Sequence, residues 1–369
     1  MAGVTPLPAS LRNLGAKVAR RVGSMHKPLV RLMRRGARAA EHRRFRDEAF
    51  AVDRALARVA AGTRPIVAGP WLAEVGYETL YWVPFLRWFA DRYAVPRERF
   101  VVLSRGGVAD WYASFASHYV DIFDLLPPEQ LAERNRSRQA AQERGGQKQS
   151  GLSDLDRELL DALEARVGSG PLNVCHPSML FRLFRHVWYG NLPLDFLWTR
   201  TRYSTLTGQA ESNAALLPDL PARFTCVKFY SGTALPMTGA HAGLVRDLVR
   251  RLAAAEPVVA LDSDYHLDEH RDFDVSDIPN VLSARAWMTP SNNLGVQSAL
   301  IGRSSQFVGT CGGLAWQAPF LGVPTTAVFA DDQLLGMHLM IARQAGRAAG
   351  AAEFATLDLR AIRRFGFQG

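Results

Sequence analysis

The sequence predicts an α/β protein with two doubly wound parallel sheets that face a cleft, preceded by a basic helical extension. Short apolar runs alternate with helical segments, glycine-rich or hydroxyl-rich turns follow several of these runs, and the series begins again after residue 222. Such alternation is typical of parallel sheets covered by helices. At 369 residues with 48% hydrophobic side chains, the chain is long enough for two cores. The expected parts are an extension over 1–62, a first domain over 63–200, a linker over 201–222 and a second domain over 223–369.

The positive charge of the chain is concentrated at its beginning. Residues 1–50 hold twelve Lys/Arg and three Asp/Glu, whereas the remaining 319 residues hold 32 of each, so the main body gives no sign of nucleic-acid binding. Basic and apolar residues are interleaved over 10–60, which predicts an amphipathic helix whose residues 10–50 contact an anionic membrane surface. The alternative is a solvated helical arm that packs on the protein itself or on a second subunit in a homodimer.

Neither a membrane-spanning helix nor a secretory signal is expected from the sequence. No run reaches the roughly eighteen apolar residues that a spanning helix needs, and basic residues interrupt the apolar residues at the N-terminus. The expected location is therefore the cytoplasm, with peripheral attachment to the inner face of the cytoplasmic membrane. Cys175, Cys226 and Cys311 share no metal-binding or redox spacing, so buried free thiols are expected.

The first half carries three expected strands and a long polar segment. Residues 129–152 lack large apolar side chains, which predicts a mobile insertion, either an acceptor-facing lid or a plain surface loop. The aromatic and basic run over 179–188 is typical of an acceptor cleft or of a helix at a domain interface. Pro84 predicts a kink or a late start in the helix around it. Strands are expected over 64–67, 99–103 and 172–175, and helices over 80–89, 111–119, 154–167 and 179–188.

Three side chains of the first half are candidates for acid–base catalysis. Glu74 lies in a loop bracketed by Gly69 and Gly76 at the carboxyl end of the first strand, where doubly wound folds place their chemistry. A helix N-cap or a structural ion pair explains this carboxylate equally well. Glu78 competes with Glu74 for a catalytic role, although it is expected in the first helical turn. His176 follows the strand over 172–175, but a lone histidine in such a loop is more often structural.

The second half repeats the strand–turn–helix series, and its strand-end loops indicate phosphate binding. A lysine at a strand end, with hydroxyls beside it and a Gly-Gly helix start opposite, makes a good diphosphate clamp. Adjacent asparagines fit a ribose, a base or a sugar, or simply cap a helix. Strands are expected over 224–229, 257–261, 280–283, 306–309, 325–329 and 354–359, and helices over 240–255, 291–301, 314–321 and 334–345. The candidate ligand-binding residues are Lys228, Tyr230, Ser231, Thr233, Asp262, Asp264, Asn292, Asn293, Thr310, Gly312 and Gly313.

The glycine loop with Glu74 and the late segment FVGTCGGLAWQAPFLGVPT resemble glycosyltransferases of the GT-B fold, of the bacterial kind that builds lipopolysaccharide, capsule or O-antigen. The resemblance covers roughly residues 64–360 and implies two Rossmann-like domains, one for the acceptor and one for a nucleotide-sugar donor. It further implies sugar transfer to a glycan or glycolipid without an obligatory metal, with Glu74 as general base and Lys228 on the departing diphosphate. Gln317 stands where such enzymes place a donor-binding glutamate.

The sequence is also compatible with three other functions. Leu261-Asp-Ser-Asp264 has the form of a DxD motif, which in GT-A glycosyltransferases holds Mn²⁺ or Mg²⁺ on the diphosphate. Transfer of another group, such as pyruvate, to a glycan is a second alternative. The third is a catalytically silent glycan-binding scaffold that sits on the membrane through its basic N-terminal segment.

Overall fold

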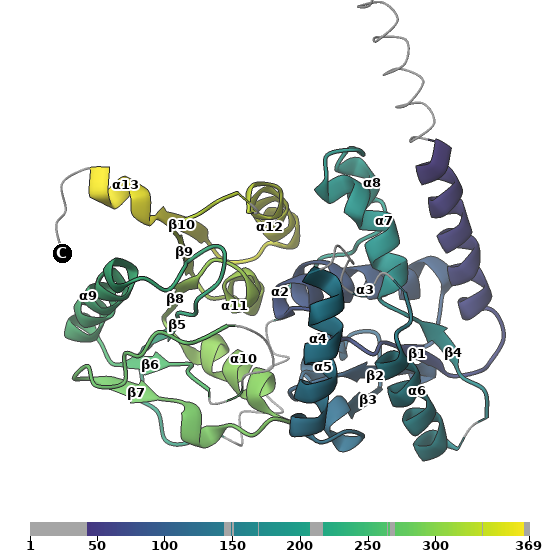
Figure 1. Ribbon diagram of the computed structural model, residues 1–369, viewed down its shortest axis with the longest axis horizontal. Helices are drawn as coiled ribbons and strands as arrows, with labels where there is room; N and C mark the ends of the chain where they lie inside the picture. Colours follow the sequence, from purple (N-terminus) through teal and green to yellow (C-terminus); the bar gives the residue numbers. More distant parts are fainter. Residues whose placement is uncertain are drawn as a thin grey trace, which may run out of the picture. The chain divides into compact units, whose positions relative to one another are not determined.

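The computed structural model describes residues 43–143, 149, 151–168, 170–206, 217–263, 265, 270–333 and 335–364 (Figure 1). The chain divides into two compact units, Met1–Arg54 and Ala55–Gly369, and both sheets belong to the second. Residues 43–60 are helical, while residues 1–42, with most of the predicted basic extension, lie outside the described part. Within the described part, no helix is long and apolar enough to cross a membrane.

The first sheet is parallel, with the strand order β3-β2-β1-β4. Its central strand β1 pairs with β2 on one side, Val67 beside Val101, and with β4 on the other, Val67 beside Val174. The strands are β1 (Ile66–Ala68), β2 (Phe100–Ser104), β3 (His118–Asp121) and β4 (Asn173–Cys175). The helices are α2 (Val75–Tyr77), the π-helix η1 (Glu78–Trp82), α3 (Val83–Tyr93), α4 (Ala109–Tyr112), α5 (Pro128–Glu143), α6 (Asp154–Val167), α7 (Ser178–Trp188) and α8 (Asp195–Trp198), with 3₁₀ turns at Arg97–Arg99 and Ile122–Asp124.

The second sheet is parallel as well, with the order β10-β9-β8-β5-β6-β7. Read from β7, its strands follow the order 3-2-1-4-5-6 of a doubly wound nucleotide-binding sheet. The strands are β5 (Thr225–Lys228), β6 (Val258–Ala260), β7 (Val281–Ser283), β8 (Gln306–Thr310), β9 (Thr325–Phe329) and β10 (Phe354–Asp358). The helices are α9 (Gly239–Ala255), α10 (Asn293–Arg303), α11 (Gly313–Gln317), α12 (Gly336–Ala349) and α13 (Leu359–Arg364), with 3₁₀ turns at Arg285–Trp287 and Ala318–Leu321. The predicted pair of doubly wound parallel sheets is confirmed.

Each sheet has its own core. In the first, α6 presents Leu155, Leu159 and Leu163 at four-residue spacing to the β1 and β2 side chains. Each fully buried leucine contributes roughly 2 kcal/mol. The Ser153 side chain starts α6 by accepting the Asp156 N–H, while Asp156 accepts the Ser153 N–H in return. In the second sheet, α9 packs on the strands in the same way. Both packed sheets therefore hold the loops at their edges in place.

Two segments of the first sheet differ from the prediction. The helix expected over 111–119 shortens to α4, because residues 118–121 form the edge strand β3 beside β2. Most of the polar stretch over 129–152 is helical rather than loop, since α5 runs from Pro128 to Glu143. Its mobility stays a prediction.

Two helices are also built differently from the expectation. The π-turn η1 comes before α3, and Pro84 occupies an early position of α3 where its missing N–H costs nothing. The helix expected over 314–321 divides into α11 and a 3₁₀ turn at Ala318–Leu321, where Pro319 cannot donate an α-helical hydrogen bond. The three cysteines are buried free thiols, as predicted.

Candidate functional site

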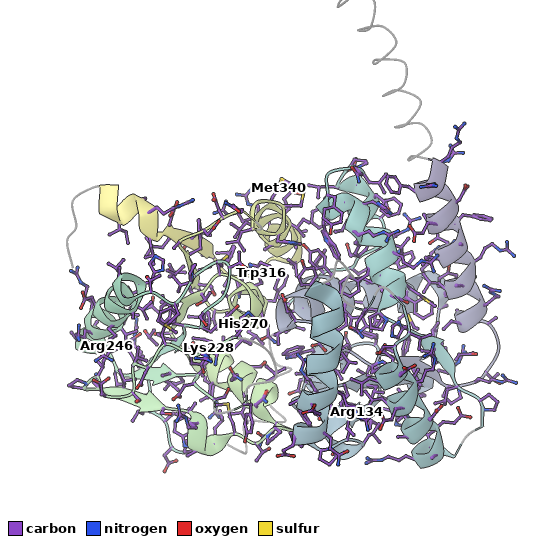
Figure 2. All side chains as sticks on the ribbon, viewed as in Figure 1. Arg134, Lys228, Arg246, His270, Trp316 and Met340 are labelled. Atoms are coloured by element: carbon purple, nitrogen blue, oxygen red, sulfur yellow. The ribbon has the colours of Figure 1, made fainter. Side chains whose placement is uncertain are left out.

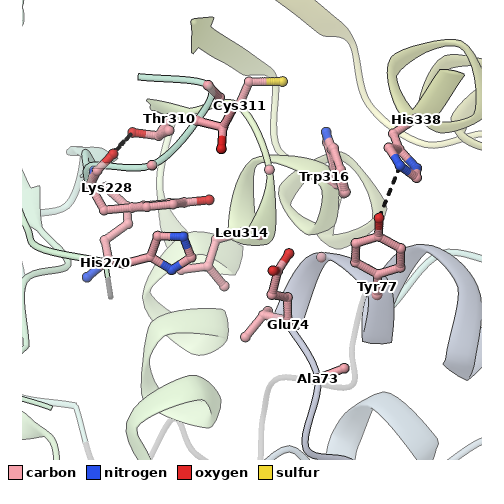
Figure 3. Close-up of a pocket in the computed structure, with 18 of the residues that line it drawn as sticks. Ala73, Glu74, Tyr77, Lys228, His270, Thr310, Cys311, Leu314, Trp316 and His338 are labelled. Atoms are coloured by element: carbon pink, nitrogen blue, oxygen red, sulfur yellow. Dashed lines mark hydrogen bonds between the residues drawn. The ribbon is translucent and has the colours of Figure 1, made fainter. Parts of the chain in front are cut away.

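A cavity of about 570 Å³ lies between the carboxyl edges of the two sheets (Figure 3). Its volume falls in the range of pockets that enclose small organic ligands. The side of the four-stranded sheet supplies Ala73–Tyr77, Arg105, Phe181, Arg185, Trp188 and Tyr189. The side of the six-stranded sheet supplies Lys228, Tyr230, Gly232–Ala234, Ser263, Tyr265, His270, Asp272, Asn293, Leu294, Gln297, Thr310–Leu314, Trp316, Leu335 and His338.

The strand order explains why the cavity is here. Strand β5 lies next to both β6 and β8, so the chain leaves β5 in one direction and returns beside it in the other. Loops that follow two such strands diverge, and the crevice between them is where open α/β sheets bind ligands. The Thr310 hydroxyl ties these loops together, since it accepts the Tyr230 N–H at 2.9 Å and donates to the Tyr230 carbonyl at 3.0 Å.

The Gly312-Gly313 turn is shaped for close approach. Gly312 has φ of 133° and Gly313 of 38°, values that favour glycine. A Cβ on Gly312 would lie 2.9 Å from the Tyr230 hydroxyl, and one on Gly313 would lie 3.3 Å from it. The Tyr230 phenol therefore sits directly over the turn, so tight turn geometry and close packing together require both glycines.

Lys228 is held by a partner inside the cavity. Its Nζ donates to Asp272 Oδ2 at 2.8 Å, and the Ser263 N–H donates to the same oxygen at 3.1 Å. The lysine is only 14% exposed. Figure 2 shows Lys228, His270 and Trp316 on the side of the six-stranded sheet that faces the other half, with Arg246 on the outer side of α9. An anionic ligand at Lys228 thus competes with Asp272 for the ammonium group.

Glu74 stands at the start of α2, with φ −70° and ψ 148°, and Figure 3 shows its carboxylate pointing into the cavity. Arg105 supports the preceding loop, since its guanidinium donates to the Trp71 carbonyl at 3.2 Å and to the Ala73 carbonyl at 3.0 Å. The Gln149 amide holds the other side of the loop, accepting the Leu72 N–H at 3.2 Å. The loop that carries Glu74 is therefore fixed on two sides.

Glu78 is close to Glu74 in sequence but does not line the cavity. Its side chain is fully buried, and Oε1 accepts hydrogen bonds from Ser104 Oγ and the Tyr112 hydroxyl, both at 2.5 Å. Oε2 has no hydrogen-bond partner among the described residues. Burial raises the pKa of Glu78 to about 7, and the hydrogen bonds from Ser104 and Tyr112 oppose that rise.

His176 also lies outside the cavity lining. Its Nδ1 accepts the Ser178 N–H at 3.1 Å, so a neutral ring carries its proton on Nε2, which faces Asp156 Oδ1 at 3.5 Å. This buried pair connects the start of α7 with the start of α6. Its geometry is that of a structural histidine.

Three predicted ligand-binding residues have other partners and do not line the cavity. Ser231 Oγ accepts the Arg271 N–H, and Asn292 Oδ1 accepts the Thr289 N–H. Asp262 accepts two contacts from Ser283 Oγ, at 2.7 and 2.9 Å, and one from Arg285. The structure does bring together Glu74, Lys228, Tyr230, Thr233, Asn293, Thr310, Gly312 and Gly313 around the cavity.

The DxD alternative depends on Asp262 together with Asp264, and Asp264 is outside the described residues. Among the residues that are described, no group of three or more His, Cys, Asp or Glu side chains could hold a metal ion. Gln317 is buried and donates to Ser298 Oγ at 3.1 Å, between α10 and α11, so it does not reach the cavity.

His338 is a cavity residue that the sequence analysis missed. It comes from α12, and its two ring nitrogens contact the hydroxyls of Tyr77 at 3.2 Å and Tyr81 at 2.5 Å. Burial lowers the pKa of His338 to about 4, although the charge of Glu74 acts in the opposite direction. The ring is therefore neutral at pH 7, with one nitrogen donating and the other accepting. A single histidine inside a helix gives no local signal of this placement.

Arg105 is a second cavity residue that the sequence analysis did not select, although its position in the sequence could have identified it. It is the second residue of a Ser-Arg-Gly-Gly turn at the carboxyl end of β2, which is the same strand-end position that singled out Glu74. The aromatic and basic run on α7, by contrast, predicts an acceptor cleft or a helix at a domain interface from the sequence alone. Phe181, Arg185 and Trp188 from that helix do line the cavity.

No family model and no curated protein matches the sequence. Among solved structures, the chain is similar to a glycosyl transferase family 9 protein from Veillonella parvula, with 13% identity, a TM-score of 0.45, and 82% of this chain and 88% of that one covered. It is similar to E. coli heptosyltransferase WaaC with ADP, with 14% identity, a TM-score of 0.40, and 82% and 98% covered. A UDP-GlcNAc 2-epimerase from Neisseria meningitidis is more distant, with 12% identity, a TM-score of 0.29, and 82% and 89% covered.

Proposed function

We propose that the protein transfers a sugar from a nucleoside-diphosphate donor to a hydroxyl group of a glycan or glycolipid in cell-surface polysaccharide synthesis. The observation that carries the proposal is the pairing of two features across one cavity. A carboxylate, Glu74, faces the loops at the switch point of a doubly wound sheet, where such sheets bind nucleotides.

The six-stranded half has the groups that a diphosphate needs. Lys228 supplies a cation, and the Tyr230 hydroxyl over the Gly312-Gly313 turn can donate a hydrogen bond to a phosphate beside that turn. The nucleoside would lie along Tyr230, Asn293 and Ser263, which follows β6. Because Asp272 already holds Lys228, donor binding exchanges one anion for another at the ammonium group.

The four-stranded half has an apolar wall and a base. Trp188 and Tyr189 at the end of α7 offer ring surfaces against which an acceptor sugar can pack, and Tyr189 is 68% exposed. Glu74 would remove the proton from the acceptor hydroxyl as that oxygen attacks C1 of the donor sugar. The bond from C1 to the diphosphate oxygen breaks, and the nucleoside diphosphate leaves with the electron pair, stabilised by Lys228. In this scheme no divalent metal is required.

The first test is binding of nucleoside diphosphates, measured as a shift in thermal unfolding with and without EDTA. A ligand at about 100 times its dissociation constant stabilises a protein by roughly 2.7 kcal/mol, which is easily measured. We expect one nucleotide to stabilise the protein in EDTA, and the effect to shrink in Lys228→Ala. A shift that requires Mn²⁺ supports the metal-dependent alternative, whereas no shift with any nucleotide contradicts a transferase and favours the scaffold.

We further propose that residues 10–50 attach the enzyme to the anionic inner face of the cytoplasmic membrane. Support comes from the charge, with twelve Lys/Arg and three Asp/Glu in residues 1–50. Flotation with vesicles tests this: the full chain should bind phosphatidylglycerol vesicles at low salt, and a chain lacking residues 1–42 should not. Equal flotation of both proteins contradicts membrane attachment, and a change from dimer to monomer on truncation favours the subunit contact.

A further inference from the structure

Gly76 brings the backbone of α2 into contact with the backbone of α11. A Cβ added to Gly76 would lie 2.9 Å from the Gly313 amide nitrogen and 2.9 Å from two ring carbons of Trp316. Gly76 is buried within a helical segment and is absent from the residues with positive φ, so space alone accounts for the glycine. Any side chain at this position must push α2 away from α11.

The next residue of α2 makes a second contact with the other half. The Tyr77 hydroxyl lies 3.2 Å from His338 Nε2, as the dashed line in Figure 3 shows, and Tyr81 meets Nδ1 of the same ring. The His338 ring also packs against Trp316, with ring centroids 5.8 Å apart, and against Trp188 at 6.0 Å. The histidine from α12 is thus enclosed by aromatic rings from both halves.

These contacts lie beside Glu74, whereas two other contacts between the halves lie on α10. The Trp111 indole N–H donates to Ser298 Oγ at 3.1 Å, and the Gly295 N–H donates to the Gly106 carbonyl at 2.8 Å. Glu74 belongs to the same turn as α2, because its carbonyl accepts the N–H groups of Tyr77 and Glu78, both at 3.1 Å. Movement of α2 relative to α11 therefore moves the backbone of Glu74.

We infer that Gly76 and His338 are positioning residues that seat α2 on the six-stranded half and so fix Glu74 relative to the Gly312-Gly313 turn. The inference rests on the proposed function, in which Glu74 deprotonates the acceptor hydroxyl that attacks the sugar carbon from which the diphosphate leaves. The base and the leaving group come from different halves of the chain. The direct backbone contact at Gly76 sets their separation without passing through a flexible side chain.

Displacing α2 should slow the chemical step of the reaction more than it weakens donor binding. A displacement of about 1 Å in a reacting group can lower a rate by about a hundredfold. Of the proposed donor-binding groups, Gly313 contacts α2 through Gly76, whereas Lys228 and its partner Asp272 are held together away from α2. Misplacing α2 should therefore lower kcat by much more than it weakens binding of the nucleoside diphosphate.

The test compares Gly76→Ala with Gly243→Ala in the full chain. Gly243 lies in α9, and a Cβ added there meets nothing within 4 Å, so its variant controls for the effect of Gly→Ala in a helix. With saturating donor and acceptor, we expect kcat of Gly76→Ala to fall at least tenfold. The dissociation constant of the nucleoside diphosphate should stay within about threefold, and Gly243→Ala should match the wild type in both.

A second variant covers the case in which Gly76→Ala fails to fold. Tyr77→Phe keeps the ring and removes only the hydroxyl that contacts His338, and we expect kcat to fall severalfold with donor affinity unchanged. Two outcomes overturn the positioning role: a wild-type kcat in these variants, or a loss of rate that matches the loss of donor affinity. If the wild-type protein transfers sugar and requires Glu74, the proposed function itself survives either outcome. A wild-type protein that turns over no donor contradicts the proposed function itself.

Discussion

Glu74 and Glu78 stand at the two ends of one helical turn, yet the protein surrounds their carboxyl groups in opposite ways. Glu74 lines the cavity, in a loop whose carbonyls are held by Arg105. Glu78 is fully buried and accepts two hydrogen bonds from Ser104 and Tyr112. A general base must reach its substrate, and of these two carboxyl groups only Glu74 lines the cavity. The comparison teaches that position relative to the cavity, and not residue type or a strand-end location, separates the candidate base from the buried acid.

The largest expected effect is on the rate of sugar transfer. Glu74→Gln should lower kcat about a thousandfold, because general-base catalysis typically contributes factors of 10² to 10⁴. Glu78→Gln is the matched control at pH 6, where it should stay within about threefold of the wild type. Transfer of radiolabelled sugar to the acceptor measures both variants. An equal loss of kcat in the two variants would contradict the assignment of Glu74, and not Glu78, as the general base.

The second effect is on stability, and it belongs to Glu78. Because burial raises its pKa from 4.5 to about 7, the folded state binds this proton more tightly than the unfolded state. The resulting stabilisation is complete below about pH 4.5 and is lost as the pH rises through 7, which amounts to roughly 3 kcal/mol. Urea unfolding from pH 4.5 to 8 should show that decrease in the wild type relative to Glu78→Gln. Parallel pH profiles for the two proteins would mean that the carboxyl is not perturbed.

Roughly half of the candidate site could be predicted from the sequence. Strand-end turns reveal themselves through glycines and hydroxyls, which is why Glu74, Lys228 and Gly312-Gly313 were found. The same rule also selected Asp262, because sequence shows where a strand ends but not which neighbour the side chain meets, here Ser283 and Arg285. His338 contacts residues some 260 positions away, a relation that only the fold creates. The sequence does not predict strand β3, because this strand is only four residues long and includes the polar His118 and Asp121.

A third effect concerns donor affinity and the ion pair between Lys228 and Asp272, which lies across the cavity from Glu74. Lys228→Ala should weaken binding of the nucleoside diphosphate about tenfold, since one charge-assisted hydrogen bond is lost. Asp272→Asn should tighten binding severalfold, because the ligand no longer competes with a carboxylate for the lysine. Isothermal titration calorimetry at fixed ionic strength measures both. Weaker binding in both variants would show that the pair acts as a unit that must stay intact.

The smallest effect is expected at Arg105, which supports Glu74 through backbone carbonyls. Arg105→Lys cannot reach the carbonyls of both Trp71 and Ala73, so kcat should fall severalfold with donor affinity unchanged. The measurement is the full steady-state profile in both substrates. A change confined to the KM of the acceptor would instead mean that the guanidinium binds the acceptor directly.

One experiment addresses the pairing of Glu74 with the donor loops most directly. It is the turnover of a panel of nucleotide sugars by the wild type and by Glu74→Gln, in EDTA, with nucleoside diphosphate release as the signal. The proposed function predicts that one donor is consumed by the wild type in the presence of acceptor, and that Glu74→Gln binds the same nucleoside diphosphate with near-normal affinity but releases it about a thousandfold more slowly. Turnover by Glu74→Gln at the wild-type rate would contradict the role of this carboxylate as the general base.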